Sequence, residues 1–246
     1  MSAFSRSWIP NQHGAWAMLI TPVLVGALAA GPTAWHLLLL LTWLAAYCLN
    51  FFLQQTLKRR RWGRHDRQIL VYGSLTALFG LPLAWRAPDL LALLVLALPA
   101  FALNVFFVLR RNERAWLNDV VGILLAGVVG YGAVLLGGRP LTDASERHAT
   151  LALVVVSAYF IGTVLYVKTL IRERGSLLWL RLSHGYHGLL VLALLATGQW
   201  TLALIAAALL ARAWYVPRVG WTPKRVGMVE IASTTAVAVG ALLTLP

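Results

Sequence analysis

Long apolar stretches alternate with short polar ones along the whole chain. Nine stretches of about 15 to 22 residues are bounded by charged residues, glycine or proline. They cover approximately 14–30, 36–56, 68–85, 90–109, 117–136, 150–170, 184–197, 200–214 and 227–244. Backbone polar groups have no water partner in lipid, so apolar segments of this length must be helices there. The pattern predicts an all-α, polytopic membrane protein with nine transmembrane helices, forming a single integral-membrane domain over residues 1–246.

The seventh and eighth stretches are short, and only Gly198 and Gln199 separate them, so one merged span is the alternative. Lys and Arg favour the cytoplasmic side of a membrane, and their distribution decides between the two topologies. Nine helices place 18 of these residues on the side of the N-terminus and 3 on the other side, whereas merging gives 14 and 7. We therefore predict a hairpin at Gly198 and Gln199, a cytoplasmic N-terminus and an external C-terminus.

Composition supports a membrane location and narrows the possible partners. The chain is 60% hydrophobic and 12% charged, with a mean hydropathy of +0.75, and a soluble domain has about 25% charged residues. The net charge of +13 does not predict nucleic-acid binding, because the charges lie between apolar stretches rather than on one polar surface. Cys48 is the single cysteine, which excludes an internal disulfide and a cysteine-based metal cluster.

Polar residues inside the predicted spans collect toward the cytoplasmic ends. Such residues are costly in lipid and mark a cavity, a ligand or a helix contact. Asn50, Gln54 and Lys58 recur every four residues, so they share one helical face. The candidate ligand-binding residues are His13, Asn50, Gln54, Lys58, Asp119, Tyr159, Lys168, Arg172, His184 and His187. They predict a cationic pocket open to the cytoplasm. In the alternative interpretation, basic residues at helix ends only contact lipid headgroups and set the topology.

Two spacings within this set suggest ligand chemistry. Lys168 and Arg172 are four residues apart on a helix, where an anion between them would offset their repulsion. His184 and His187 are three residues apart, but a zinc site needs three or four ligands, and His13 is the only further histidine predicted at a matching depth. We predict no metal or cofactor, and a haem- or quinone-binding redox subunit stays as an alternative.

Three segments carry a resemblance to a known family. The sequences WIPNQHGAWAM near the start, GTVLYVKTLIRERGS from Gly162 and SHGYH from Ser183 resemble the YwiC-like family of bacterial membrane proteins. The resemblance extends over the whole chain and implies the bacterial cytoplasmic (inner) membrane as the location. It implies no particular reaction.

A more distant resemblance suggests a ligand class. Nine helices with polar motifs ending the second and sixth look like the UbiA superfamily of intramembrane prenyltransferases, whose NxxxDxxxD and DxxxD motifs bind Mg²⁺ and a prenyl diphosphate. Here Asn50, Gln54 and Lys58 stand at the first motif, and Lys168 and Arg172 at the second. Mg²⁺ needs oxygen ligands, so these replacements remove its site. The resemblance implies a UbiA-like bundle.

We therefore predict a membrane protein that binds an anionic lipid or isoprenoid headgroup without Mg²⁺. An active prenyl or related transferase is the first alternative, and the redox subunit is the second. The predicted partners are membrane lipids or an isoprenoid, with no nucleic acid, and the pattern specifies neither the oligomeric state nor whether the protein is an enzyme.

Overall fold

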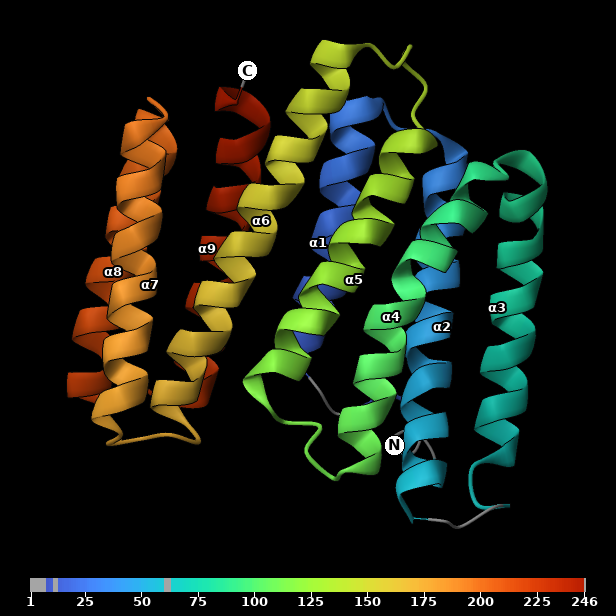
Figure 1. Ribbon diagram of the computed structural model, residues 1–246, viewed down its shortest axis with the longest axis horizontal. Coiled ribbons are helices and arrows are strands. Elements are labelled where there is room, and N and C mark those ends of the chain that lie inside the picture. Colours follow the sequence, from blue (N-terminus) through green and yellow to red (C-terminus); the bar gives the residue numbers. More distant parts are fainter. Residues whose placement is uncertain (1–7, 11–12, 60–62, 246) are drawn as a thin grey trace. The chain divides into compact units, whose positions relative to one another are not determined.

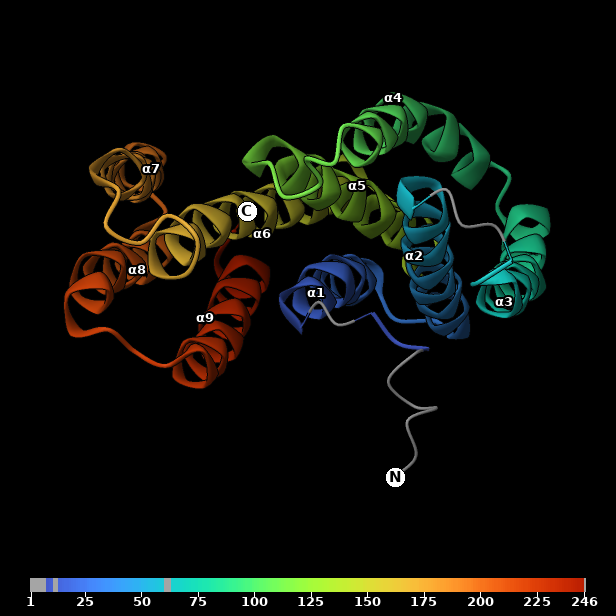
Figure 2. The same ribbon diagram turned by 90° about the horizontal axis from the view of Figure 1, so that it is seen from below.

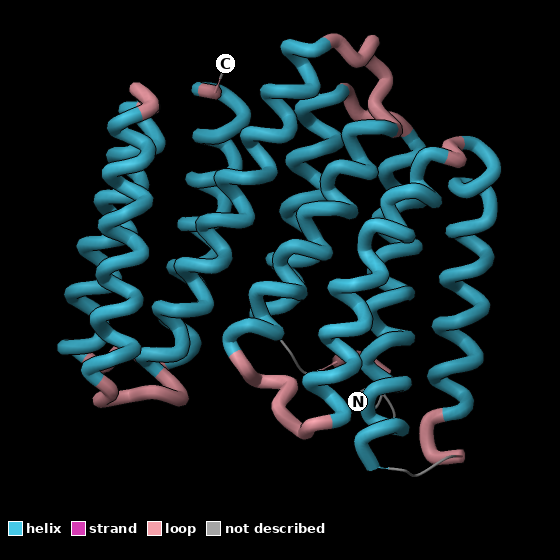
Figure 3. The backbone as a smooth tube through the Cα atoms, in the orientation of Figure 1, coloured by secondary structure: helices cyan, strands magenta, loops and turns pink. Residues whose placement is uncertain are grey.

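The computed structural model describes residues 8–10, 13–59 and 63–245, and within these ranges it contains nine α-helices and no strand (Figures 1 and 3). The helices are α1 (His13–Ala30), α2 (Ala34–Arg59), α3 (Asp66–Arg86), α4 (Asp89–Leu109), α5 (Trp116–Leu135), α6 (Asp143–Leu170), α7 (Leu177–Ala196), α8 (Trp200–Val219) and α9 (Pro223–Thr244). Helices α2 to α9 are long and apolar enough to cross a membrane, and α1 is a shorter apolar helix. The predicted all-α, polytopic membrane fold is confirmed.

The break between the seventh and eighth helices lies where the sequence predicts it. Helix α7 ends at Ala196, α8 begins at Trp200, and Gly198 takes a left-handed φ of 73°. Glycine adopts this conformation readily because it has no Cβ. Two short apolar stretches are therefore two helices rather than one.

Helices α7 and α8 are both longer than the sequence predicts. Helix α7 begins at Leu177 rather than at residue 184, and α8 continues to Val219 rather than ending at residue 214. The predicted spans leave out Arg181 and Arg218, because charge is costly in lipid. Arg181 nevertheless lies exposed near the start of α7, where a long side chain can reach the polar interface. Arg218 lies exposed near the end of α8, whereas Arg212, which the predicted span includes, has a partner on another helix.

The chain divides into two compact units, Met1–Leu141 and Thr142–Pro246. The first (unit 1) contains α1 to α5, and the second (unit 2) contains α6 to α9 (Figure 2). That the two form a single integral-membrane domain stays a prediction.

In unit 1, α5 packs against α1 and α4, and α2 packs against α3. Helices α1 and α5 approach so closely that a Cβ added at Gly26 would overlap the main-chain oxygen of Gly130 and lie 3.1 Å from Cβ of Ala133. Small residues permit such contact between membrane helices. His36, which is buried, links α2 to α5 because its Nε2 donates to the main-chain oxygen of Ala133 over 2.8 Å.

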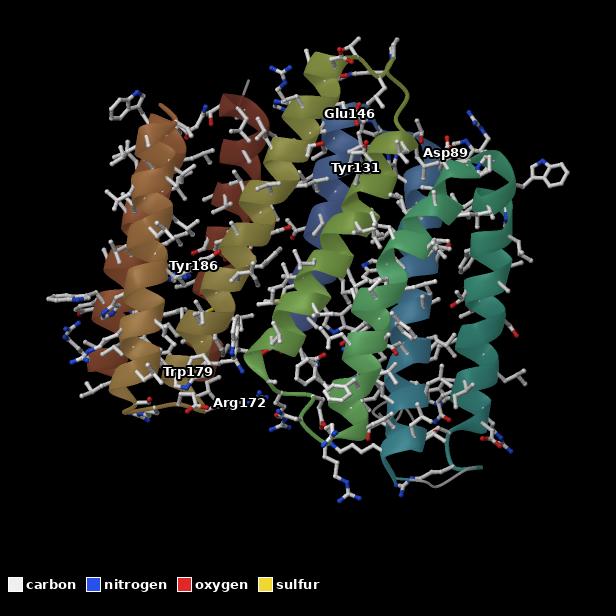
Figure 4. All side chains as sticks on the ribbon, viewed as in Figure 1. Asp89, Tyr131, Glu146, Arg172, Trp179 and Tyr186 are labelled. Carbon is white, nitrogen blue, oxygen red and sulfur yellow. The ribbon has the colours of Figure 1, made fainter. Side chains whose placement is uncertain are left out.

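In unit 2, α6 and α8 each pack against both α7 and α9. Gly162 allows α7 to approach α6, since a Cβ there would lie 3.1 Å from the ring of Tyr186. The Tyr186 hydroxyl, at mid-height on α7 in Figure 4, donates to the main-chain oxygen of Ala158 on α6 over 2.9 Å. A polar side chain thus links α7 to α6 inside unit 2.

Candidate functional site

Unit 2 contains a buried ion pair between Arg212 of α8 and Glu230 of α9. The two side chains retain only 8% and 16% of their accessible surface. Each residue lies two helical turns, about 10 Å, from the turn that joins α8 to α9. We call the pair and its contacts the Arg212 centre, comprising Tyr159, Thr163, Tyr166, Arg212, Glu230, Ser233 and Thr234.

Hydrogen bonds occupy both carboxylate oxygens of Glu230. Oε1 accepts from Nη1 of Arg212, and Oε2 accepts from the hydroxyls of Tyr159, at 2.9 Å, and Thr163, at 3.1 Å. The Tyr159 proton is directed at Glu230, so the Thr234 hydroxyl, 3.1 Å away, donates to the Tyr159 oxygen. Donors from α6 and α8 therefore reach both oxygens of Glu230 inside the unit.

The guanidinium of Arg212 is only partly paired. Nη1 donates to Glu230 and to Oγ of Ser233, at 3.1 Å, and Cζ lies 4.3 Å from the ring centroid of Tyr166. Nε and Nη2 are buried and have no hydrogen-bond partner among the described residues, and the same holds for the hydroxyls of Tyr166 and Ser183. A buried donor without an acceptor costs about 1–3 kcal/mol, and more when it is charged. A group that supplies hydrogen-bond acceptors could pair with these donors.

The two candidate histidines lie beside this centre on α7. His184 donates through Nε2 to the main-chain oxygen of Ala213, at 3.2 Å, and His187 donates through Nδ1 to the main-chain oxygen of Ser183, at 2.7 Å. His187 is buried, with Nε2 next to Gly162. The described residues contain no group of three His, Cys, Asp or Glu that could hold a metal ion. The side chain of His13 lies outside the described residues.

Lys168 and Arg172 do not form the helical face that their spacing predicts. Helix α6 ends at Leu170, and Arg172 lies exposed in the following turn, at the same end of unit 2 as Trp179 (Figure 4). Lys168 is buried, with 7% exposure, and its Nζ lies 5.7 Å from the Trp179 ring centroid. The chain leaves the helix here and turns back into α7, so Arg172 lies beyond the end of α6, although its N–H still donates to the main-chain oxygen of Lys168 over 3.2 Å.

Gln54 and Lys58 belong to a second polar cluster, in unit 1. Gln54 donates to Asn104 over 2.6 Å, Asn104 donates to Asn118 over 2.8 Å, and Asn118 donates to the main-chain oxygen of Glu113 over 2.8 Å. Lys58 forms an ion pair with the Glu113 side chain. We call these five residues the amide network. It links α2, α4, α5 and the turn between α4 and α5.

The structure assigns the remaining candidates to one unit or the other. Tyr159 lies in the Arg212 centre, and Asn50 and Asp119 are half-buried residues of α2 and α5. Asn50, Gln54 and Lys58 are in unit 1 and Lys168 is in unit 2. The predicted convergence of these groups on one pocket therefore stays a prediction.

Sequence reasoning missed Asn104 and Glu113 in unit 1, and Arg212 and Glu230 in unit 2. The signal that could have identified two of them is an isolated polar residue within an apolar span. Asn104 is the single polar residue in the last 20 positions of α4, and Arg212 interrupts the apolar run of α8. Such residues inside a membrane span indicate function or a helix contact.

Sequence comparisons identify the family. A profile of the family described as "YwiC-like protein" matches residues 9–134. The chain is 36% identical over 230 residues to "Uncharacterized protein YwiC" of Bacillus subtilis, covering 93% of this chain and 94% of that protein. The chain belongs to the YwiC-like family. This YwiC-like protein is also 30% identical over 226 residues to an "Uncharacterized protein" of Haemophilus influenzae, covering 92% and 93% of the two chains. No solved structure matches.

The amide network of this YwiC-like protein predicts a pH-dependent contribution to stability. Burial raises the pKa of Glu113, but the hydrogen bond from Lys58, a backbone hydrogen bond and nearby positive charges outweigh it and hold the pKa below its usual value. A carboxyl of this kind stabilises the fold above its unfolded pKa of about 4.3, and the contribution is lost as the pH falls through the lower, folded value.

We therefore expect Glu113→Gln to reduce the free energy of unfolding by at most about 1 kcal/mol at pH 7, because the pair is one-third exposed. Thermal unfolding in one detergent at pH 7 and below pH 4 measures the difference, which should vanish in acid. A difference that persists unchanged in acid would show that the Glu113 charge is not its source.

Proposed function

We propose that this YwiC-like membrane protein binds the anionic headgroup of a lipid or an isoprenoid through its own cations. The observation that supports this is the Arg212 guanidinium, which is buried within a membrane span and has Nε and Nη2 unpaired among the described residues. A charged group in a span is costly and marks a functional site by default. An anion would supply acceptors for those donors and a charge opposite to that of Arg212.

An amphiphile fits this unit better than a free anion does. Large apolar side chains are exposed along the helices around the centre, including Leu189 and Leu192 on α7, Leu204 on α8 and Ile231 on α9. In a membrane these side chains meet lipid tails. A ligand with a charged head and an apolar tail would place the head at Arg212 and the tail along this surface.

We further propose that binding does not use a divalent metal. Mg²⁺ is bound through carboxylates and other oxygen ligands. The Arg212 centre contains one carboxylate, Glu230, and both of its oxygens already accept hydrogen bonds. Chelation should therefore leave the affinity unchanged.

The test compares two arginines on the same helix. Lysine keeps the charge but loses the planar fork of donors, so Arg212→Lys should weaken binding of short-chain phosphatidylglycerol by roughly 10- to 150-fold, the equivalent of a charge-assisted contact of about 1.5–3 kcal/mol. Arg218→Lys is the matched control, because Arg218 is exposed on α8 and lies over the ring of Trp214. Calorimetric titration with and without EDTA measures both variants.

Other outcomes of these measurements would assign a different function to the protein. Equal affinity in the wild type and Arg212→Lys would leave Arg212 as a link between α8 and α9, and loss of binding in EDTA would indicate a metal site. Release of diphosphate from a prenyl donor would make the protein a transferase. A Soret band in the purified sample would support the redox alternative at His184 and His187.

We also propose that the protein lies in the bacterial inner membrane with its N-terminus in the cytoplasm. This orientation rests on the 18 to 3 division of Lys and Arg between the two sides. A reporter fused after Pro246 should be external, and one inserted between Arg61 and Arg64 should be cytoplasmic. A cytoplasmic reporter at Pro246 would reverse the assignment.

A further inference from the structure

We infer that an anion bound at Arg212 is accompanied by a proton taken up at Glu230, so that this site binds the two together. The inference rests on the proposed function, because it presupposes that an anionic headgroup binds at Arg212. It adds a coupled proton and a chemical class of ligand, a phosphate group.

The geometry of Arg212 defines how the anion would bind. Nη1 is occupied by Glu230 and Ser233. The two nitrogens without a partner among the described residues, Nε and Nη2, lie on one edge of the guanidinium, with N–H bonds that point the same way. Two parallel N–H donors match two oxygens of one anion. Arg212 can therefore bind Glu230 through Nη1 and a second anion through Nε and Nη2.

Two further donors favour phosphate over carboxylate. The Tyr166 ring lies 4.3 Å from Cζ of Arg212, and its hydroxyl has no hydrogen-bond partner within the described chain. The buried Ser183 hydroxyl also has no hydrogen-bond partner within the described chain. Ser183 lies at the level of Arg212, because the next residue, His184, bonds to the main-chain oxygen of Ala213. A carboxylate has two oxygens, and a phosphate group has more acceptors for these donors.

The charges of the centre explain the proton. Arg212 and Glu230 together carry no net charge, so an added anion would leave one uncompensated negative charge in a buried site. Such a charge is strongly unfavourable. Protonation of the Glu230 carboxylate by a proton from solvent restores neutrality, with Arg212 then paired to the bound anion.

Among the groups around Glu230, we infer that Glu230 itself accepts this proton. Helix α6 presents Tyr159 and Tyr166, whose phenols are already protonated at neutral pH, and α8 presents Arg212, which stays charged. On α7, beside Arg212, His184 and His187 each use one ring N–H on a main-chain oxygen. They are the alternative proton acceptors.

The experiment uses probes that do not titrate themselves. Short-chain phosphatidylglycerol and dimethyl phosphate are both phosphodiesters with one fixed negative charge, and only the first has lipid tails. The detergent-solubilised full-length protein is titrated with each between pH 5.5 and 8.5. Proton uptake on mixing is followed with an indicator dye in weak buffer.

For the wild type we expect the Kd for phosphatidylglycerol to rise tenfold per pH unit over the upper part of this range, with uptake approaching one proton per ligand. Dimethyl phosphate should show the same slope at lower affinity, and equal affinities would make the ligand a free phosphodiester. Glu230→Gln should bind with a Kd that does not vary with pH. Glu173→Gln, in the turn after α6, should keep the wild-type slope.

The possible failures are distinguishable. Absence of binding at every pH overturns the proposed function and this inference with it. If the wild type binds the ligand without taking up a proton, the inference is overturned and the proposed function is not. This measurement uses the wild type alone, so it does not depend on whether any variant folds. A slope that persists in Glu230→Gln would assign the proton to His184 or His187 and overturn the role of Glu230.

Discussion

Replacing Arg212 by alanine is expected to destabilise the protein by about 3–5 kcal/mol, the largest effect that a single substitution should have here. The change removes the positive partner of Glu230, which retains only 16% of its accessible surface. A buried carboxylate without its partner is costly, because neither water nor a cation compensates its charge. Reversible unfolding in mixed micelles, followed by circular dichroism, measures the loss.

Two controls separate the loss of the pair from a general effect on α8. Arg218→Ala changes the same residue type at an exposed position of the same helix and should alter stability by no more than about 0.5 kcal/mol. Replacing both partners, with Arg212→Met and Glu230→Met together, should recover most of the loss, because apolar residues of similar volume substitute well for buried ion pairs. An Arg212→Ala protein as stable as the wild type would contradict the buried pairing.

Gly26→Ala should produce the second large effect, in unit 1. The added Cβ would overlap the main-chain oxygen of Gly130, and a backbone atom cannot move aside as a flexible side chain can. Separation of α1 from α5 should cost about 1–3 kcal/mol, the range for an overfilled interior. The same unfolding measurement reports it.

Gly122→Ala is the matched control for this substitution. Gly122 lies in α5 of the same unit, and an added Cβ there would meet nothing within 4 Å. Alanine is up to about 1 kcal/mol more favourable than glycine in a helix, so this variant should be as stable as the wild type or more stable. If both variants behaved alike, close approach at Gly26 would not control the packing of α1 and α5.

The number of helices and their order follow from the sequence alone. In lipid, an apolar run of about 20 residues forms a helix, because its backbone N–H and C=O groups must hydrogen-bond to one another. The hairpin at Gly198 was also predictable, because the charge distribution requires a break there and glycine allows the turn. The start of α7 and the end of α8 were not, because the predicted spans leave out Arg181 and Arg218, which both lie inside these helices.

Part of the candidate site was also accessible from the pattern. The four-residue spacing of Gln54 and Lys58 indicated one polar helical face, and both residues join the amide network. Spacing could not identify their partners, Asn104 and Glu113, because a partner on another helix depends on how that helix is rotated and how deeply it lies. The spacing of Lys168 and Arg172 presupposed one continuous helix through both residues, whereas α6 ends at Leu170.

Only the tertiary structure shows which residues form the Arg212 centre. In the sequence, Arg212 is one of many basic residues that define a topology, and Glu230 is one acid near the start of α9. Packing of α8 against α9 brings them together from equal distances on either side of their common turn, and α6 adds Tyr159 and Thr163. Hydropathy and charge determine which segments enter the membrane, whereas the helix rotations fixed by side-chain packing determine which polar groups meet inside it.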